Sequence, residues 1–255
     1  MKNVKEEIAP YVMLDSPIPF KEKLYIYPIK VKDFYLFNSF IDIFLIEKNK
    51  IPEVRIIQMN YLQFITRELF RSNELYNGYK IGDLWNYKFF SLLSLVFKKK
   101  VNDIVLKEDE NGKVYIKIED IEINAKEFDE LRKIVLFQNI YDYDDTEMSD
   151  DFRKVVEEYY ALKSKGIKDI TLEDKIDVVM QSLKANIEQI SNMTYRRLCK
   201  QFQLAIDQVD YIVGCYGYTR EKPPEHWVYK SNKGKYDDVF IDANSFKNKI
   251  QSANK

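Results

Sequence analysis

Apolar residues recur at helical spacing along most of the chain. Such stripes predict helices over about 31–48, through 59–69 and through 84–97, and further helices after Asn124, Thr171 and Thr194. The last stripe is the longest, with Leu198, Phe202, Ala205, Ile206, Val209, Ile212 and Val213 on one face. The pattern predicts a mainly α protein with small β-hairpin elements, of the α+β class, whose helices form bundle lobes.

Two segments change from helical to alternating spacing. The opening, from Ile8 to Ile29, carries four prolines and an alternation around Leu24 and Ile26, which predicts a short strand pair or an extended arm. The segment near 103–118 alternates on both sides of Asn-Gly, the dipeptide typical of hairpin turns. We expect a β-hairpin there, joined by a third short strand near 121–123.

Polar residues mark where helices begin. Asn124 with Glu127, and Thr171 with Asp174, have the spacing of a capping box, in which two side chains satisfy the free N–H groups of a first turn. Thr194 is in the same place before the longest apolar stripe. We therefore expect helices to start at these three residues.

An acidic run divides the chain. Residues 141–151 hold six carboxylates and bury nothing, which is typical of a linker. We therefore predict three parts. Residues 1–140 form a helical lobe with the strand arm and the hairpin, residues 141–151 form the acidic linker, and residues 152–255 form a helical bundle with a partly ordered C-terminal tail.

The composition excludes some classes of function. With 45% apolar residues, the 255-residue chain has enough material to bury a core without metal or disulfide. Forty basic against 41 acidic residues leave a net charge of −1, so no overall field attracts nucleic acid or an anionic membrane. No apolar run approaches a membrane span, and no signal peptide is seen. These features predict a location in the cytoplasm.

Candidate chemistry is sparse. The single histidine, His226, lies in a polar tail and is more typical of a surface residue than of a catalytic base. With it and two cysteines, Cys199 and Cys215, no zinc site of usual spacing can be written, and no glycine-rich phosphate motif occurs. We expect no cofactor and no catalytic residue.

One basic cluster has an unusual position. Arg196, Arg197 and Lys200, with Tyr195 beside them, lie at the start of the longest predicted helix, where cations oppose the helix dipole. Their placement indicates an acidic partner, which is the chain's own acidic linker, a protein or phosphate. Together with Trp227 of the tail they are our candidate partner-binding residues.

Three stretches together resemble a family. They are SPIPFKEKLYIYPIKVKDFYLFNSFIDIFLIEKNKIP, INAKEFDELRKIVLFQNI and TLEDKIDVVMQSLKANIEQISNMTYRRLCKQFQLAI, the last followed by the tail HW…GKYDDVFIDANSF. They are similar to tail assembly chaperones and virion morphogenesis proteins of phages and prophages of low-GC Gram-positive bacteria. The resemblance implies a non-enzymatic protein in the host cytoplasm or the virion. It implies binding to other phage structural proteins such as the tape-measure protein, and leaves oligomerisation open.

Two other functions stay open on the residues alone. A nucleic-acid-binding or regulatory module would use the basic start of the longest helix, and a steep loss of affinity with salt would mark it. A nuclease-like enzyme would need a metal held by carboxylates, for which the tail offers Asp237, Asp238 and Asp242.

Overall fold

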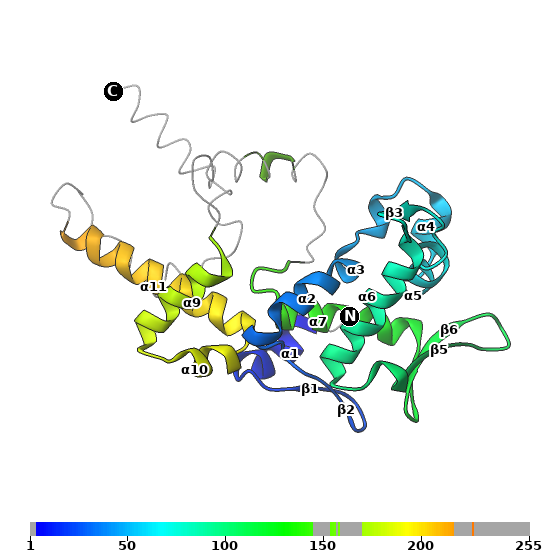
Figure 1. The fold of residues 1–255 in the computed structure, drawn as a ribbon, viewed down its shortest axis with the longest axis horizontal. Helices are drawn as coiled ribbons and strands as arrows, with labels where there is room; N and C mark the ends of the chain where they lie inside the picture. Colours follow the sequence, from blue (N-terminus) through cyan, green and yellow to red (C-terminus); the bar gives the residue numbers. More distant parts are fainter. Residues whose placement is uncertain (1–3, 145–153, 157, 159–169, 217–225, 227–255) are drawn as a thin grey trace. The chain divides into compact units, whose positions relative to one another are not determined.

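The computed structural model describes residues 4–144, 154–156, 158, 170–216 and 226 (Figure 1). These residues fall in two compact units. Unit 1 is Met1–Tyr143 with Asn186–Leu198, and unit 2 is Asp144–Ala185 with Cys199–Lys255. The structure is mainly helical with small antiparallel sheets, so the predicted fold class is confirmed.

Unit 1 contains all the strands of the described residues. Strands β1 (Ile18–Lys21) and β2 (Leu24–Ile26) pair antiparallel, which confirms the predicted strand pair. Strands β5 (Ile104–Glu108), β6 (Val114–Ile118) and β7 (Ile121–Ile123) form a sheet in that order. The predicted hairpin and its third strand are therefore confirmed.

The hairpin turn is closed by its own polar residue. Asp109 accepts hydrogen bonds from the backbone N–H groups of Asn111 and Lys113, at 2.9 and 2.8 Å. Gly112 follows with φ +74°, a left-handed conformation that glycine adopts without steric cost. The aspartate and the glycine together fix the register of β5 against β6.

Two long helices carry the core of unit 1. In α6 (Ile81–Phe97) and α7 (Ala125–Asn139) the buried side chains follow the predicted helical spacing. The rings of Phe44, Phe128, Phe89 and Phe70 form a chain in which neighbouring centroids are 5.5–5.7 Å apart. These four rings therefore lie in the core or against it, and edge-to-face pairs add to the stabilisation by burial.

Short helices complete unit 1. They are α1 (Val4–Met13), η1 (Val31–Asp33), α2 (Phe34–Phe40), α3 (Asp42–Leu45), η2 (Lys48–Lys50), α4 (Val54–Gln58), α5 (Tyr61–Phe64), the π-helical turn η3 (Ile65–Leu69), η4 (Val101–Asp103) and α10 (Ile187–Asn192).

The predicted helix starts are confirmed. The Asn124 side chain accepts from the N–H groups of Lys126 and Glu127, and the Glu127 carboxylate accepts from the N–H of Asn124. Thr171 and Asp174 make the equivalent box before α9 (Leu172–Leu183). The longest helix, α11, spans Tyr195–Tyr216, directly after Thr194.

Two sequence-based predictions were wrong in detail. Residues 8–13 were expected in the extended arm but belong to α1, which keeps Pro10 although proline removes one helical hydrogen bond. Burial of Ile8 in the core outweighs that loss. The single helix expected over 31–48 is broken into η1, α2 and α3, and the Asp42 side chain accepts from the N–H of Ile43 in the first turn of α3.

A second hairpin had no counterpart in the sequence analysis. Strands β3 (Leu75–Tyr76) and β4 (Tyr79–Lys80) are joined by Asn77 and Gly78, both with positive φ, as a tight hairpin turn requires. The same dipeptide predicted the larger hairpin. Here the flanking strands have only two residues each, too few to show alternation.

Backbone hydrogen bonds join the two separate stretches of sequence that form unit 1. The N–H of Val31 donates to the carbonyl of Met193 at 2.9 Å, and the N–H of Tyr195 donates to the carbonyl of Ile29 at 2.8 Å. Residues 186–198 therefore belong with the N-terminal part, whereas the sequence-based division placed them with 152–255. Residues 145–151 of the proposed acidic linker lie outside the described residues.

In unit 2 the described elements are α9 and the greater part of α11. Val179 of α9 and Phe202 of α11 are buried. Among the described residues of both units, no helix is long and apolar enough to cross a membrane.

We predict that Gly82→Ala destabilises the protein. The N–H of Gly82 donates to the carbonyl of Ser72, and an added methyl group would overlap the carbonyl oxygen of Phe70 and lie 2.8 Å from that of Ser72. Both obstacles are backbone atoms, so the free energy of unfolding should fall by about 1–3 kcal/mol. Urea denaturation measures the change. Asn86→Ala, at an exposed position of the same helix, is the control and should change it by less than about 0.5 kcal/mol.

Candidate functional site

The first turn of α11 is held by the N-terminal part of unit 1. Thr194 caps the helix by accepting from the N–H of Arg197, and its hydroxyl donates to Asp15 Oδ1 at 2.8 Å. Arg197 Nε donates to Asp15 Oδ2 at 2.8 Å, and its Nη2 donates to the carbonyl of Met13. Asp15 is thus an acidic partner of Arg197 within the chain, and it lies outside the acidic run 141–151 that the sequence offered as the internal partner.

Arg196 closes the end of another helix. Its Nη1 donates to the carbonyls of Phe137 and Ile140, at 2.9 and 2.7 Å. These carbonyls belong to the last turn of α7, where helix carbonyls lack internal partners and favour a cation. The guanidinium therefore supplies a donor to the Phe137 carbonyl and a second donor to the Ile140 carbonyl, which also accepts from the N–H of Tyr143.

The other candidate residues differ in their surroundings. The Tyr195 ring stacks on Phe34 with centroids 4.1 Å apart. Lys200 is exposed in unit 2, and Trp227 lies outside the described residues. The structure brings Tyr195, Arg196 and Arg197 together through internal contacts, and their binding to a separate protein stays a prediction.

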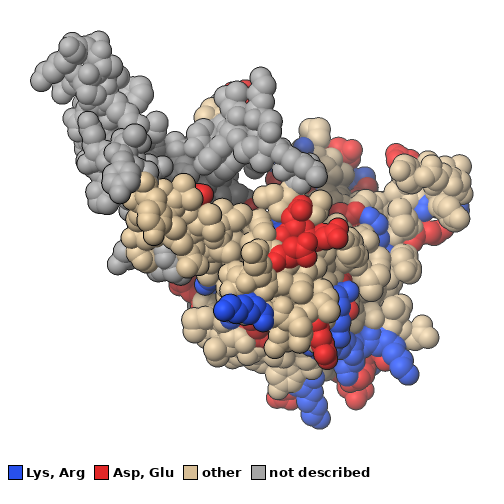
Figure 2. All heavy atoms as spheres, turned by 60° about the vertical axis from the view of Figure 1, so that its left-hand side comes forward, with Lys and Arg blue, Asp and Glu red and all other residues tan. Residues whose placement is uncertain are grey.

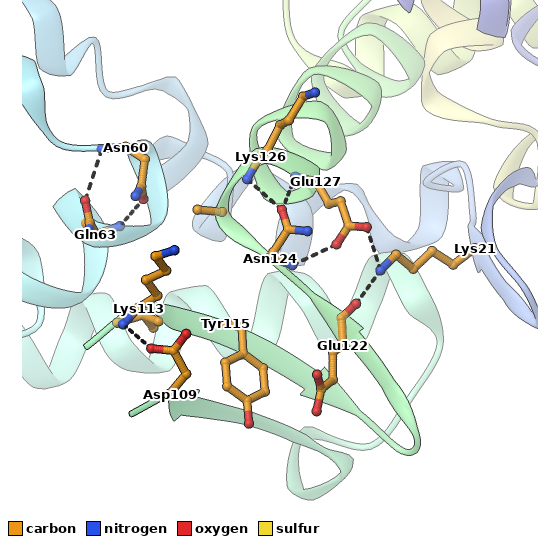
Figure 3. A pocket seen from close by; sticks show the side chains of 12 residues that line it. Lys21, Asn60, Gln63, Asp109, Lys113, Tyr115, Glu122, Asn124, Lys126 and Glu127 are labelled. Atoms are coloured by element: carbon orange, nitrogen blue, oxygen red, sulfur yellow. Dashed lines mark hydrogen bonds and ion pairs between the residues drawn. The ribbon is translucent and has the colours of Figure 1, made fainter. Parts of the chain in front are cut away.

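A polar cleft of about 810 Å³ lies between the sheet and the starts of α5 and α7 (Figure 3). Two of its three carboxylates, those of Glu127 and Asp109, have structural partners. Glu127 pairs with Lys21 at 2.7 Å and caps α7, and Asp109 holds the hairpin turn. These groups serve the local fold, and the cleft has both signs of charge. Its lining residues are Lys21, Asn60, Gln63, Asp109, Lys113, Val114, Tyr115, Glu122, Asn124, Ala125, Lys126 and Glu127.

A second polar cluster is buried near α5. Burial raises the pKa of Tyr61 to about 12, and the Tyr61 hydroxyl donates to the carbonyl of Ile46. Burial also raises the pKa of Asp129. Arg132 covers the Tyr61 ring at 4.1 Å, and its Nε donates to the carbonyl of Phe44 at 2.6 Å. This cluster fixes the end of α3.

Candidate metal ligands do not converge in the part of the chain that is described. No group of three or more His, Cys, Asp or Glu side chains among those residues could hold a metal ion. Asp237, Asp238 and Asp242 lie outside the described residues. His226 is described, and its ring lies 5.0 Å from that of Tyr211.

Unit 1 exposes a set of large apolar and aromatic side chains around the β3–β4 hairpin. The hairpin presents them on both strands, and Tyr79 is 76% exposed. Strand β4 leads directly into α6, whose first turns add two more exposed side chains. Helix α6 packs against α2, and the ring of Tyr87 on α6 lies 5.8 Å, centroid to centroid, from the ring of Phe40 on α2. We call this set the aromatic patch: Leu75, Tyr76, Tyr79, Leu84 and Tyr87.

A second exposed apolar surface lies on α11. Leu198, Phe202 and Ala205 of its apolar stripe are buried, as the spacing predicted. The same stripe continues through Val209 and Ile212, which are exposed. The apolar face of α11 is therefore buried in its first half and exposed in its second half.

Charged side chains of both signs are mixed on the described surface. Figure 2 shows lysines and arginines gathered at the lower right of the face that it draws, with aspartates and glutamates between them. This mixture agrees with the net charge of −1.

Comparison with protein-family models, with curated proteins and with solved structures finds no match to this chain.

We predict that Asp15→Ala lowers the free energy of unfolding by roughly 1–3 kcal/mol. The change removes the acceptor of Thr194 and Arg197 and leaves a half-buried guanidinium without its carboxylate. Urea denaturation measures the loss. The matched control is Glu119→Ala, which removes the partner of Lys99 in a more exposed ion pair and should cost less than about 1 kcal/mol. Equal losses in the two variants would contradict a structural role for Asp15.

Proposed function

We propose that the protein is a tail assembly or virion morphogenesis protein of phages and prophages of low-GC Gram-positive bacteria. In this function it binds another structural protein of the particle, such as the tape-measure protein, in the host cell and carries out no reaction of its own. The resemblance of the three sequence stretches motivates the proposal. The aromatic patch is the one structural observation that supports it most directly.

Exposing the aromatic patch to water costs free energy. Leu75, Tyr76 and Tyr79 are each more than 60% exposed on a hairpin of two-residue strands. Large apolar side chains gathered on a surface favour binding to another protein, because contact removes them from water. Tyrosine is suited to this task, since it gives a large contact area with few rotatable bonds and keeps a polar hydroxyl.

The hairpin also suggests how the patch is presented. Its turn residues have the φ values of a tight turn, and the N–H of Ile81, just after β4, donates to the carbonyl of Glu74 at 2.8 Å. The tyrosines therefore project from a short, hydrogen-bonded frame. A frame of this kind lowers the entropy that binding would cost.

A nucleic-acid-binding function has less support. Its candidate side chains, Arg196 and Arg197, make hydrogen bonds to carbonyls and to Asp15 within unit 1. A phosphate ligand would have to compete with these bonds. We therefore propose protein binding.

The test is capture of a virion protein by the tagged full chain in phage-producing cells, with identification by mass spectrometry. The variant carries Tyr76→Ser, Tyr79→Ser and Tyr87→Ser, which keep a hydroxyl and remove most of the apolar area. We expect the wild type to capture a structural protein of the particle and the variant to retain less than about a tenth of it, because loss of central aromatic contacts costs about 2 kcal/mol or more.

The control is Tyr25→Ser, which removes an exposed tyrosine of unit 1 that lies on β2, outside the patch. It should capture as much virion protein as the wild type. Capture of no virion protein by the wild type would contradict the proposed function. Undiminished capture by the triple variant would exclude the patch as the binding surface.

A further inference from the structure

We propose that Asn77, in the turn of the β3–β4 hairpin, is a site of spontaneous deamidation in the folded protein. The chain has two Asn-Gly dipeptides, Asn77-Gly78 and Asn111-Gly112, and both lie in hairpin turns. We expect the reaction at Asn77 and a much slower one at Asn111. The site forms in the chain by itself, so it does not depend on the proposed function.

The reaction needs only the dipeptide and water. The backbone nitrogen of the glycine loses its proton and attacks Cγ of the asparagine, and the new N–Cγ bond closes a succinimide ring. The Cγ–Nδ2 bond breaks, and the side-chain nitrogen leaves as ammonia with that proton. Water then opens the ring at either carbonyl and yields aspartate or iso-aspartate, so a neutral amide becomes a carboxylate. Glycine favours the attack because it has no side chain beside its nitrogen and rotates freely.

The turn at Asn77 leaves both reacting groups accessible. Asn77 and Gly78 are exposed, and apart from the adjacent residues no described atom lies within 4 Å of the position that a Cβ on Gly78 would occupy. The N–H of Gly78 makes no hydrogen bond to the backbone of another described residue. The attacking nitrogen therefore gives up no bond to that backbone.

The short strands allow this turn to change shape. Ring closure requires the peptide group between Asn77 and Gly78 to rotate out of its turn conformation. Strands β3 and β4 form two residue pairs, whereas β5 and β6 form five. Rotation within the two-pair hairpin breaks few hydrogen bonds and costs little free energy. The bond from the N–H of Ile81 to the carbonyl of Glu74 lies at the other end of the hairpin and can persist.

The turn at Asn111 is held by bonds that the reaction would have to break. The N–H of Gly112 donates to the Asp109 carbonyl at 2.9 Å, so the attacking nitrogen already has a partner. The Asp109 carboxylate accepts from the N–H groups of Asn111 and Lys113. Each such bond corresponds to a factor of about five in the population of the closed turn, so two or more slow the reaction at least ~10-fold.

The product changes the aromatic patch. Asn77 follows Tyr76 directly and lies two positions before Tyr79, so deamidation places a negative charge beside two exposed tyrosines. Iso-aspartate also adds a methylene group to the backbone, which alters the geometry that a two-residue turn requires. The hairpin that presents the tyrosines is therefore expected to change as the molecule ages.

The test follows both asparagines in one sample of the purified full chain, incubated at neutral pH. Trypsin then releases Asn77 in the peptide of residues 72–80 and Asn111 in the peptide of residues 108–113. Mass spectrometry resolves the exchange of –NH2 for –OH in each peptide. We expect Asn77 to react at least ~10-fold faster than Asn111 in the folded chain. In urea, where both turns are lost, the two rates should agree within about threefold.

Asp109→Ala removes the carboxylate that holds the second turn and should speed the reaction of Asn111 by about fivefold or more, with Asn77 unchanged. Asp109→Asn keeps an acceptor oxygen and is the matched control, which should react as the wild type does. Far-UV circular dichroism checks that both variants stay folded. Equal rates at Asn77 and Asn111 in the folded wild type would overturn the inference, as would an Asn111 rate that Asp109→Ala does not change. Capture of a virion protein is measured separately, so either proposal can fail alone.

Discussion

The junction between residues 29–31 and 193–195 determines how the rest of unit 1 is assembled. Two backbone hydrogen bonds and the stacking of Phe34 on Tyr195 join segments that are about 160 residues apart in the sequence. Closing so long a loop costs conformational entropy, so the junction needs several contacts at once. The side chains of Thr194 and Arg197 supply further contacts by donating to Asp15, and Arg196 donates to the Ile140 carbonyl at the end of α7.

Local signals predicted much of the fold because their physical causes are local. A capping box depends on residues three positions apart, and a hairpin turn depends on a dipeptide with positive φ. The starts of α7 and α9 and the β5–β6 hairpin were therefore predictable. That Pro10 lies inside a helix depended on burial of Ile8 against residues distant in the sequence. The end of α2 at Phe40 depended on how an almost wholly apolar segment packs.

The candidate surfaces were less predictable, for a related reason. The position of Arg196 and Arg197 at a helix start indicated an acidic partner, but nothing in the local sequence identified Asp15 or the carbonyls of α7. Leu84 belonged to an apolar helical stripe and was expected inside, yet it lies on the aromatic patch. Whether an apolar face is covered depends on what packs against it, and a periodic pattern has no information about that.

Gly82 has a consequence for recognising relatives of this protein. Its Cα lies against two carbonyl oxygens at the point where the β3–β4 hairpin enters α6, and Asn77 with Gly78 forms the turn just before. Any chain that keeps this hairpin-to-helix corner needs small residues at the same spacing, even after the surrounding side chains have diverged. The pattern Asn-Gly followed four positions later by Gly, at the start of an aromatic-rich helix, is thus a compact query for distant homologues.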